Sequence, residues 1–159
     1  MLSSAGLLVC GASFLASTGN SWQLTGKGYE SDARLPALLA RANEALGRAL
    51  ERVQGELGWK ARQPPIRWAF DVSLPPEPTD ATPGGEKKFF DAGSTAFLRE
   101  GFVQVTLPGR KYLQHPEGVD HVIEHEAVHA VLASCLGTRE RYSAVPRWFR
   151  EGIALFFSG

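Results

Sequence analysis

The segment VDHVIEHEAVHAVLASCL, residues 119–136, decides the fold because it combines a helical apolar pattern with polar residues at a fixed spacing. His125 and His129 are four residues apart and Glu126 follows the first histidine, which gives the pattern H-E-x-x-H. On a helix, side chains at this spacing project from the same face, so two imidazoles can reach one metal ion. Burying unpaired histidine and glutamate is costly. The pattern therefore favours a metal site, and the alternative is a pair of hydrogen-bonded core histidines.

A second segment, VPRWFREGIALFF at residues 145–157, supplies a third candidate ligand. Glu151 follows the second histidine by 22 residues, and Pro146 is typical of a helix start. Catalytic zinc usually has three protein ligands, so a lone carboxylate in this apolar setting is a suitable third one. Gly152 is expected to let the two helices approach closely. Further apolar side chains are expected to bury against the 119–136 helix: Trp148, Leu155 and either Phe149 or Phe156.

Together the two motifs resemble the gluzincin metallopeptidases, and most closely the group called peptidase MA-like. The second motif is similar to the W-x-x-E-G-x-A helix of the zinc aminopeptidases, in which the glutamate is the third zinc ligand. The resemblance covers about Val119 to Phe157. It implies a Zn²⁺ ion held by His125, His129 and Glu151. It also implies a zinc metallopeptidase that hydrolyses peptide or protein substrates through metal-activated water, with Glu126 as general base.

The sequence departs from the family pattern at two points. The Gly-Ala-Met-Glu-Asn segment with which aminopeptidases hold a free amino terminus is missing. In the family, a Tyr or His downstream of the third ligand commonly assists zinc, and residues 152–159 contain neither. We therefore expect residues 19–159 to form one C-terminally incomplete zincin domain. His121 and Tyr142 are candidates for a second shell or the cleft, with a solvated histidine as the alternative for His121. Substitutes for the missing group, each also explained as a surface or loop residue, are Tyr142, Arg139, Arg141 and His115.

Two other functions stay open. One is a catalytically weak or inactive zinc-binding domain, in which the metal mainly joins the last two helices. The other is a domain without metal, in which Glu151 forms an ion pair with Arg147 or Arg150 and is turned away from the histidines. A Glu126→Gln variant distinguishes the weak or inactive zinc-binding domain from a peptidase. Metal analysis of the purified protein identifies the domain without metal.

The rest of the chain predicts an α+β domain with a small, mainly antiparallel sheet. Apolar residues at intervals of three and four predict a long N-terminal helix over Leu35–Leu57, capped by Ser31 or Asp32 and ended by Gly58. Its charged residues are expected on a solvated face: Arg41, Glu44, Arg48, Glu51 and Arg52. Strands are predicted at 66–72, 93–98 and 102–107, with a proline-rich loop at 73–86 and a hairpin turn at 99–101. Both long helices should cover the same face of the sheet, and strand 93–98 or 102–107 should be the edge that pairs with an extended peptide.

Composition excludes several classes of function. The 159 residues suit one domain, and 17 Lys+Arg balance 17 Asp+Glu, so charge gives no case for nucleic acid as a partner. No run of 18 apolar residues predicts an integral membrane span. Two cysteines, Cys10 and Cys135, cannot build a disulfide scaffold, and Cys135 is expected to be a buried, inert thiol. Residues 1–18 are interpreted as a secretory leader, a disordered leader or a first strand, which leaves export open.

Overall fold

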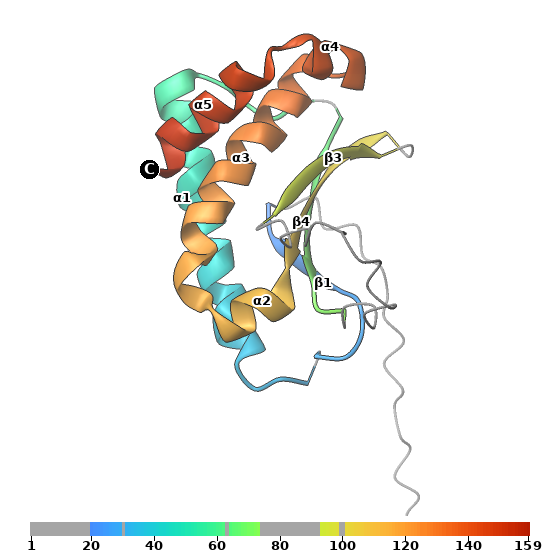
Figure 1. Ribbon diagram of the computed structural model, residues 1–159, viewed down its shortest axis with the longest axis vertical. Helices are drawn as coiled ribbons and strands as arrows, with labels where there is room; N and C mark the ends of the chain where they lie inside the picture. The colour runs from blue at the N-terminus through green and yellow to red at the C-terminus, as the bar shows by residue number, and fades with distance from the viewer. Residues whose placement is uncertain (1–19, 30, 63, 74–92, 99–100) are drawn as a thin grey trace, which may run out of the picture.

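The computed structural model describes residues 20–29, 31–62, 64–73, 93–98 and 101–159 (Figure 1). The predicted leader, most of the proline-rich loop and residues 99–100 of the predicted hairpin turn lie outside these residues. The elements in chain order are β1 (Trp22–Thr25), α1 (Leu35–Leu57), β2 (Ile66–Asp71), β3 (Ser94–Leu98), β4 (Phe102–Pro108), α2 (Gly109–Gln114), a 3₁₀ turn (Pro116–Gly118), α3 (Val119–Leu136), α4 (Arg139–Ala144) and α5 (Arg147–Ser158).

The α+β class and the two long helices are confirmed. Helices α1 and α3 have the predicted bounds, and α1 ends at Gly58, which adopts the left-handed conformation at φ 67°. The Oδ1 atom of Asp32 accepts a hydrogen bond from the backbone N–H of Arg34 at 2.9 Å, but no side chain caps the helix itself. No described helix is long and apolar enough to cross a membrane.

The sheet is mixed, so the expectation of mainly antiparallel pairing was wrong. Its strand order is β1-β2-β4-β3, in which β1–β2 and β2–β4 are parallel and only β3–β4 is antiparallel. The short strand β1 was not predicted, and α1 links it to β2 as the crossover that parallel neighbours require. The hairpin of β3 and β4 then returns the chain alongside β2. Strand β3 therefore lies at the edge of the sheet, beyond β4.

Both long helices pack on one face of the sheet, as predicted (Figure 1). The main core contains Leu46 from α1, Phe70 from β2, Val105 from β4 and Ile123 from α3, and each of these side chains is fully buried. Burying a side chain of this size stabilises a fold by roughly 1.5–3 kcal/mol. Helix α3 thus packs against both the sheet and α1, which gives its histidines a rigid support.

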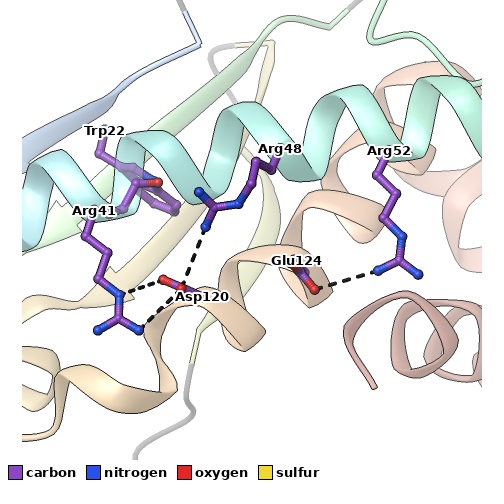
Figure 2. Close-up of polar contacts among 7 residues, drawn as sticks. Trp22, Arg41, Arg48, Arg52, Asp120 and Glu124 are labelled. Atoms are coloured by element: carbon purple, nitrogen blue, oxygen red, sulfur yellow. Dashed lines mark hydrogen bonds and ion pairs between the residues drawn. The ribbon is translucent and has the colours of Figure 1, made fainter.

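The charged face of α1 is exposed, as predicted, and three of its arginines also form ion pairs with α3 (Figure 2). The guanidinium of Arg41 donates two hydrogen bonds to the Asp120 carboxylate, at 2.9 and 3.3 Å, and Arg48 lies 3.7 Å from the same carboxylate. Arg52 lies 3.9 Å from Glu124. The three arginine side chains remain 42–57% exposed, so each pair contributes at most about 1 kcal/mol. These ion pairs therefore add little to the buried packing between α1 and α3.

Helix α5 packs through a different face from the one predicted. Trp148, Leu155 and one of two phenylalanines were expected to contact α3, but all four candidates are exposed by 39–76%: Trp148, Phe149, Leu155 and Phe156. Ala154 and Phe157 are buried instead, in a small cluster with Val53 of α1 and with Val128 and Val131 of α3. Gly152 is exposed and has no atom within 4 Å of an added Cβ, so it is not the point of close approach.

Candidate metal centre

The two histidines of α3 face the same side, as the four-residue spacing predicts. The Nε2 atoms of His125 and His129 lie 3.1 Å apart. His129 is buried and His125 is half-buried, because this face of α3 lies at the junction with α5 and β3. The pair is therefore held at the rim of the core, where it is open to a pocket.

Helix α5 brings Glu151 to the histidines. Its Oε2 atom lies 3.6 Å from the Nε2 atom of His125 and 3.6 Å from that of His129. The competing interpretation turned Glu151 away toward an arginine. The structure instead places the Nε atom of Arg147, whose side chain is 85% exposed, at 4.0 Å from the other carboxylate oxygen. Glu151 can thus form an ion pair with Arg147 through its Oε1 atom while its Oε2 atom faces both imidazoles.

The three donor atoms fit the geometry of a tetrahedral metal site. Ligand atoms that are each about 2.0–2.2 Å from a tetrahedral zinc ion are separated from one another by roughly 3.3–3.6 Å. The separations here are 3.1, 3.6 and 3.6 Å, and His125, His129 and Glu151 form a group that could hold a metal ion. Two nitrogen donors and one carboxylate also suit a divalent transition metal.

Burial keeps the imidazoles in the state that a metal requires. It lowers the pKa of His129 to about 4, and the neighbouring His125 acts in the same direction. Burial also lowers the pKa of His125, while the Glu151 carboxylate opposes this shift. Both rings are therefore neutral at pH 7, with a lone pair available for a ligand bond.

Tyr142, which was predicted to line the cleft or to contact a metal ligand, lies beside the Nδ1 atom of His129. Its hydroxyl oxygen is 3.2 Å from the Nδ1 atom of that ring. If Nε2 binds a metal, Nδ1 carries the proton. The Nδ1–H group then donates a hydrogen bond to the tyrosine oxygen, which fixes the ring orientation. Burial raises the pKa of Tyr142 although Arg150 acts in the opposite direction, so the hydroxyl is uncharged at pH 7. Its ring packs against Phe97 of β3, with centroids 5.7 Å apart.

Glu126 lies in the same pocket as the three candidate ligands. Only 7% of its surface is exposed, and its carboxylate accepts a hydrogen bond from the Thr95 hydroxyl at 2.7 Å. Gly93, the residue before β3, lies against it, since a Cβ atom there would be 2.9 Å from the Glu126 Cγ atom. Sequence reasoning did not find Thr95 or Gly93, because only the packing of β3 on α3 places them beside the glutamate.

The pocket has a volume of about 530 Å³, and its wall includes the positively charged side chain of Arg150. His121 is exposed and lies at its wall, whereas the proposed substitutes Arg139, Arg141 and His115 do not line it. Arg150 does, and the sequence had suggested it only as an ion-pair partner of Glu151. The lining residues are Gly93, Ser94, Thr95, His121, Val122, His125, Glu126, His129, Tyr142, Arg150 and Glu151.

Cys135 has no place in the site. Its thiol is half-buried rather than fully buried as predicted, and its sulfur donates to the backbone carbonyl of Lys60 at 3.0 Å. Six residues along α3 from His129, it does not line the pocket. Cys135 therefore joins α3 to the chain that follows α1.

A family described as "Protein of unknown function (DUF1570)" matches residues 121–159. The matched stretch contains the three candidate ligands, Glu126 and Tyr142, and it excludes the sheet and α1. No curated protein and no solved structure matches the chain.

Proposed function

We propose that this domain is a zinc-dependent metallopeptidase of the gluzincin type. His125, His129 and Glu151 would hold the ion, and Glu126 would act as general base. The observation that carries the proposal is the position of the Glu151 Oε2 atom, 3.6 Å from both Nε2 atoms, with the Glu126 carboxylate in the same pocket. A core pair of hydrogen-bonded histidines would need neither carboxylate there.

Each residue has a defined task in the proposed reaction. Bound zinc would polarise the peptide carbonyl and make water a better nucleophile. Glu126 takes a proton from the water as its oxygen attacks the carbonyl carbon, and delivers that proton to the amine nitrogen as the C–N bond breaks. The Thr95 hydroxyl, 2.7 Å from the carboxylate, orients Glu126 for this transfer. Tyr142 keeps His129 in the tautomer that leaves Nε2 free.

Strand β3 is the proposed binding edge for an extended peptide. Of the two strands considered from the sequence, it is the one at the sheet edge, because 102–108 lies between β2 and β3. Ser94 and Thr95 of β3 line the pocket, next to Glu126. A peptide that pairs with this edge would run past the candidate metal centre.

Two variants separate metal binding from chemistry. Glu151→Ala should lower zinc affinity by orders of magnitude and abolish hydrolysis, because two histidines hold zinc weakly. Glu126→Gln should keep zinc near full occupancy and remove only turnover, since glutamine keeps the size but cannot accept the proton. Glu124→Gln is the matched control, because Glu124 lies on the same helix and does not line the pocket. Zinc is measured by metal analysis after dialysis and turnover with a quenched fluorescent peptide library.

The outcomes distinguish the remaining functions. Zinc uptake that is unchanged in Glu151→Ala would refute the ligand set. Zinc that binds as proposed, with no difference in turnover between the natural protein and Glu126→Gln, would favour the alternative of a structural metal. That alternative has its own support, since the candidate ligands come from both α3 and α5 and an ion would join these helices.

A further inference from the structure

Arg150 is a half-buried cation in the wall of the pocket. Its Cζ atom lies 4.5 Å from the centre of the Tyr142 ring, and the hydroxyl of that ring is 3.2 Å from His129. The aromatic face therefore holds the guanidinium beside the candidate metal centre. An arginine in this position is fixed before any ligand arrives, so less rotamer entropy is lost on binding.

No carboxylate of the described residues lies within 4.0 Å of the Arg150 nitrogens, whereas Arg34, Arg41 and Arg147 all have an acidic partner. Its Nε atom is also buried without a hydrogen-bond partner in the described part of the chain. A buried donor that is not hydrogen-bonded costs free energy, and the cost is greater when the group is charged. The side chain is thus ready to bind an anion.

The charge of the pocket favours the same ligand. Apart from histidines, the charged side chains of its lining are the carboxylates of Glu126 and Glu151, with two formal negative charges, and the guanidinium of Arg150. A divalent ion would balance these two charges, so the guanidinium of Arg150 would leave the loaded pocket with a net positive charge. Such a pocket raises the local concentration of anionic substrates.

We infer that Arg150 is a specificity-determining residue that binds a carboxylate of the substrate next to the scissile bond. The substrate class is a peptide whose negative charge lies within a residue or two of that bond, either as the free C-terminus or as an acidic side chain. The planar guanidinium matches a carboxylate with two parallel hydrogen bonds. This inference rests on the proposed peptidase function and specifies its substrate.

The test measures binding in protein that does not turn over. Zinc-loaded Glu126→Gln protein is titrated with three fluorescent tripeptides: a free acid, its C-terminal amide, and an amide that ends in glutamate. We expect the amide without charge to bind at least tenfold more weakly than one of the charged peptides. Adding Arg150→Gln should weaken that charged peptide by about 10–100-fold and leave the neutral one unchanged. Which charged peptide responds shows whether Arg150 selects a C-terminus or an acidic side chain.

Two further variants keep the test specific. Arg150→Lys retains the charge but loses the two-pronged geometry, so it should restore part of the preference for the charged peptide. Arg139→Gln removes the same charge from an exposed arginine outside the pocket and should change no affinity. Zinc content and thermal unfolding are measured for every variant, so that loss of the fold is recognised.

The inference and the proposed function fail in different ways. Equal affinity for the charged and neutral peptides, or a preference that survives Arg150→Gln, would overturn the role of Arg150 even if the protein hydrolyses peptides. A preference that depends on Arg150, together with no hydrolysis by the natural protein, would support the binding site and refute the peptidase. Absence of zinc would refute the proposed function directly.

Discussion

Gly93→Ala should damage the site because β3 passes Glu126 without room for a side chain. A Cβ atom at Gly93 would lie 2.8 Å from the Leu107 Cδ2 atom, 2.9 Å from the Glu126 Cγ atom and 3.1 Å from the Val122 Cγ1 atom. Carbon atoms pack best at about 3.5–4.0 Å, so several neighbours must each move by roughly half an ångström or more. Leu107 is fully buried and the Thr95 hydroxyl holds the Glu126 carboxylate, so neither side chain moves freely.

Overpacking of this kind costs about 1–3 kcal/mol. In a chain of this length each kcal/mol lowers Tm by about 2–4 °C. Turnover should fall further than stability implies, because the displaced group is the proposed base. Zinc affinity should stay within a few-fold, because Glu126 is not a proposed ligand.

The assay is urea unfolding of the metal-free protein, followed by zinc titration and peptide hydrolysis. Gly55→Ala is the matched control, since Gly55 lies in α1, is exposed and has no atom within 4 Å of an added Cβ. That variant should be stabilised by about 0.5–1 kcal/mol with no change in activity. A Gly93→Ala protein as stable and active as the natural one would show that β3 does not press on Glu126, and the account of how the base is positioned would be wrong.

Three other predictions test the ligand shell, the buried histidine and the packing of α5. Tyr142→Phe removes the partner of the His129 Nδ1 atom and should weaken zinc binding by about 10–100-fold in a chelator competition; unchanged affinity would contradict its role. Burial lowers the His129 pKa to about 4 from its ordinary 6.5, so the unfolded chain takes up the proton first as the pH falls. The metal-free protein should therefore lose up to about 3 kcal/mol of stability as the pH falls from 6.5 to 4, with this contribution fully present above pH 6.5. A urea midpoint that does not change with pH in this range would count against the lowered pKa. Phe157→Ala, at a side chain that is 3% exposed, should cost about 3–5 kcal/mol, whereas Phe156→Ala, at 72% exposed, should stay within about 0.5 kcal/mol; equal losses in thermal unfolding would refute the packing face of α5.

Local pattern was sufficient to find α1 and β2. The stripe that includes Leu38, Ala42 and Leu46 set the bounds of α1, and alternation at Trp68 and Phe70 found β2. Pattern was insufficient where an element has several apolar sides or very few residues. Helix α5 has apolar residues on several sides, so periodicity did not show which of them would face α3. Strand β1 has only four residues, and without it the parallel pairing of the sheet could not be inferred.

The sequence by itself determined the pair of histidines, because the helix converts a spacing of four residues into one shared face. It also indicated Glu151 as the third candidate, through its resemblance to a known motif. Only the tertiary structure decided that the Glu151 Oε2 atom lies 3.6 Å from both imidazoles, since its place depends on how Ala154 and Phe157 seat α5 against its neighbours. The same holds for Thr95 and Arg150. Their positions in the pocket depend on contacts between segments far apart in the chain, and no local period encodes such contacts.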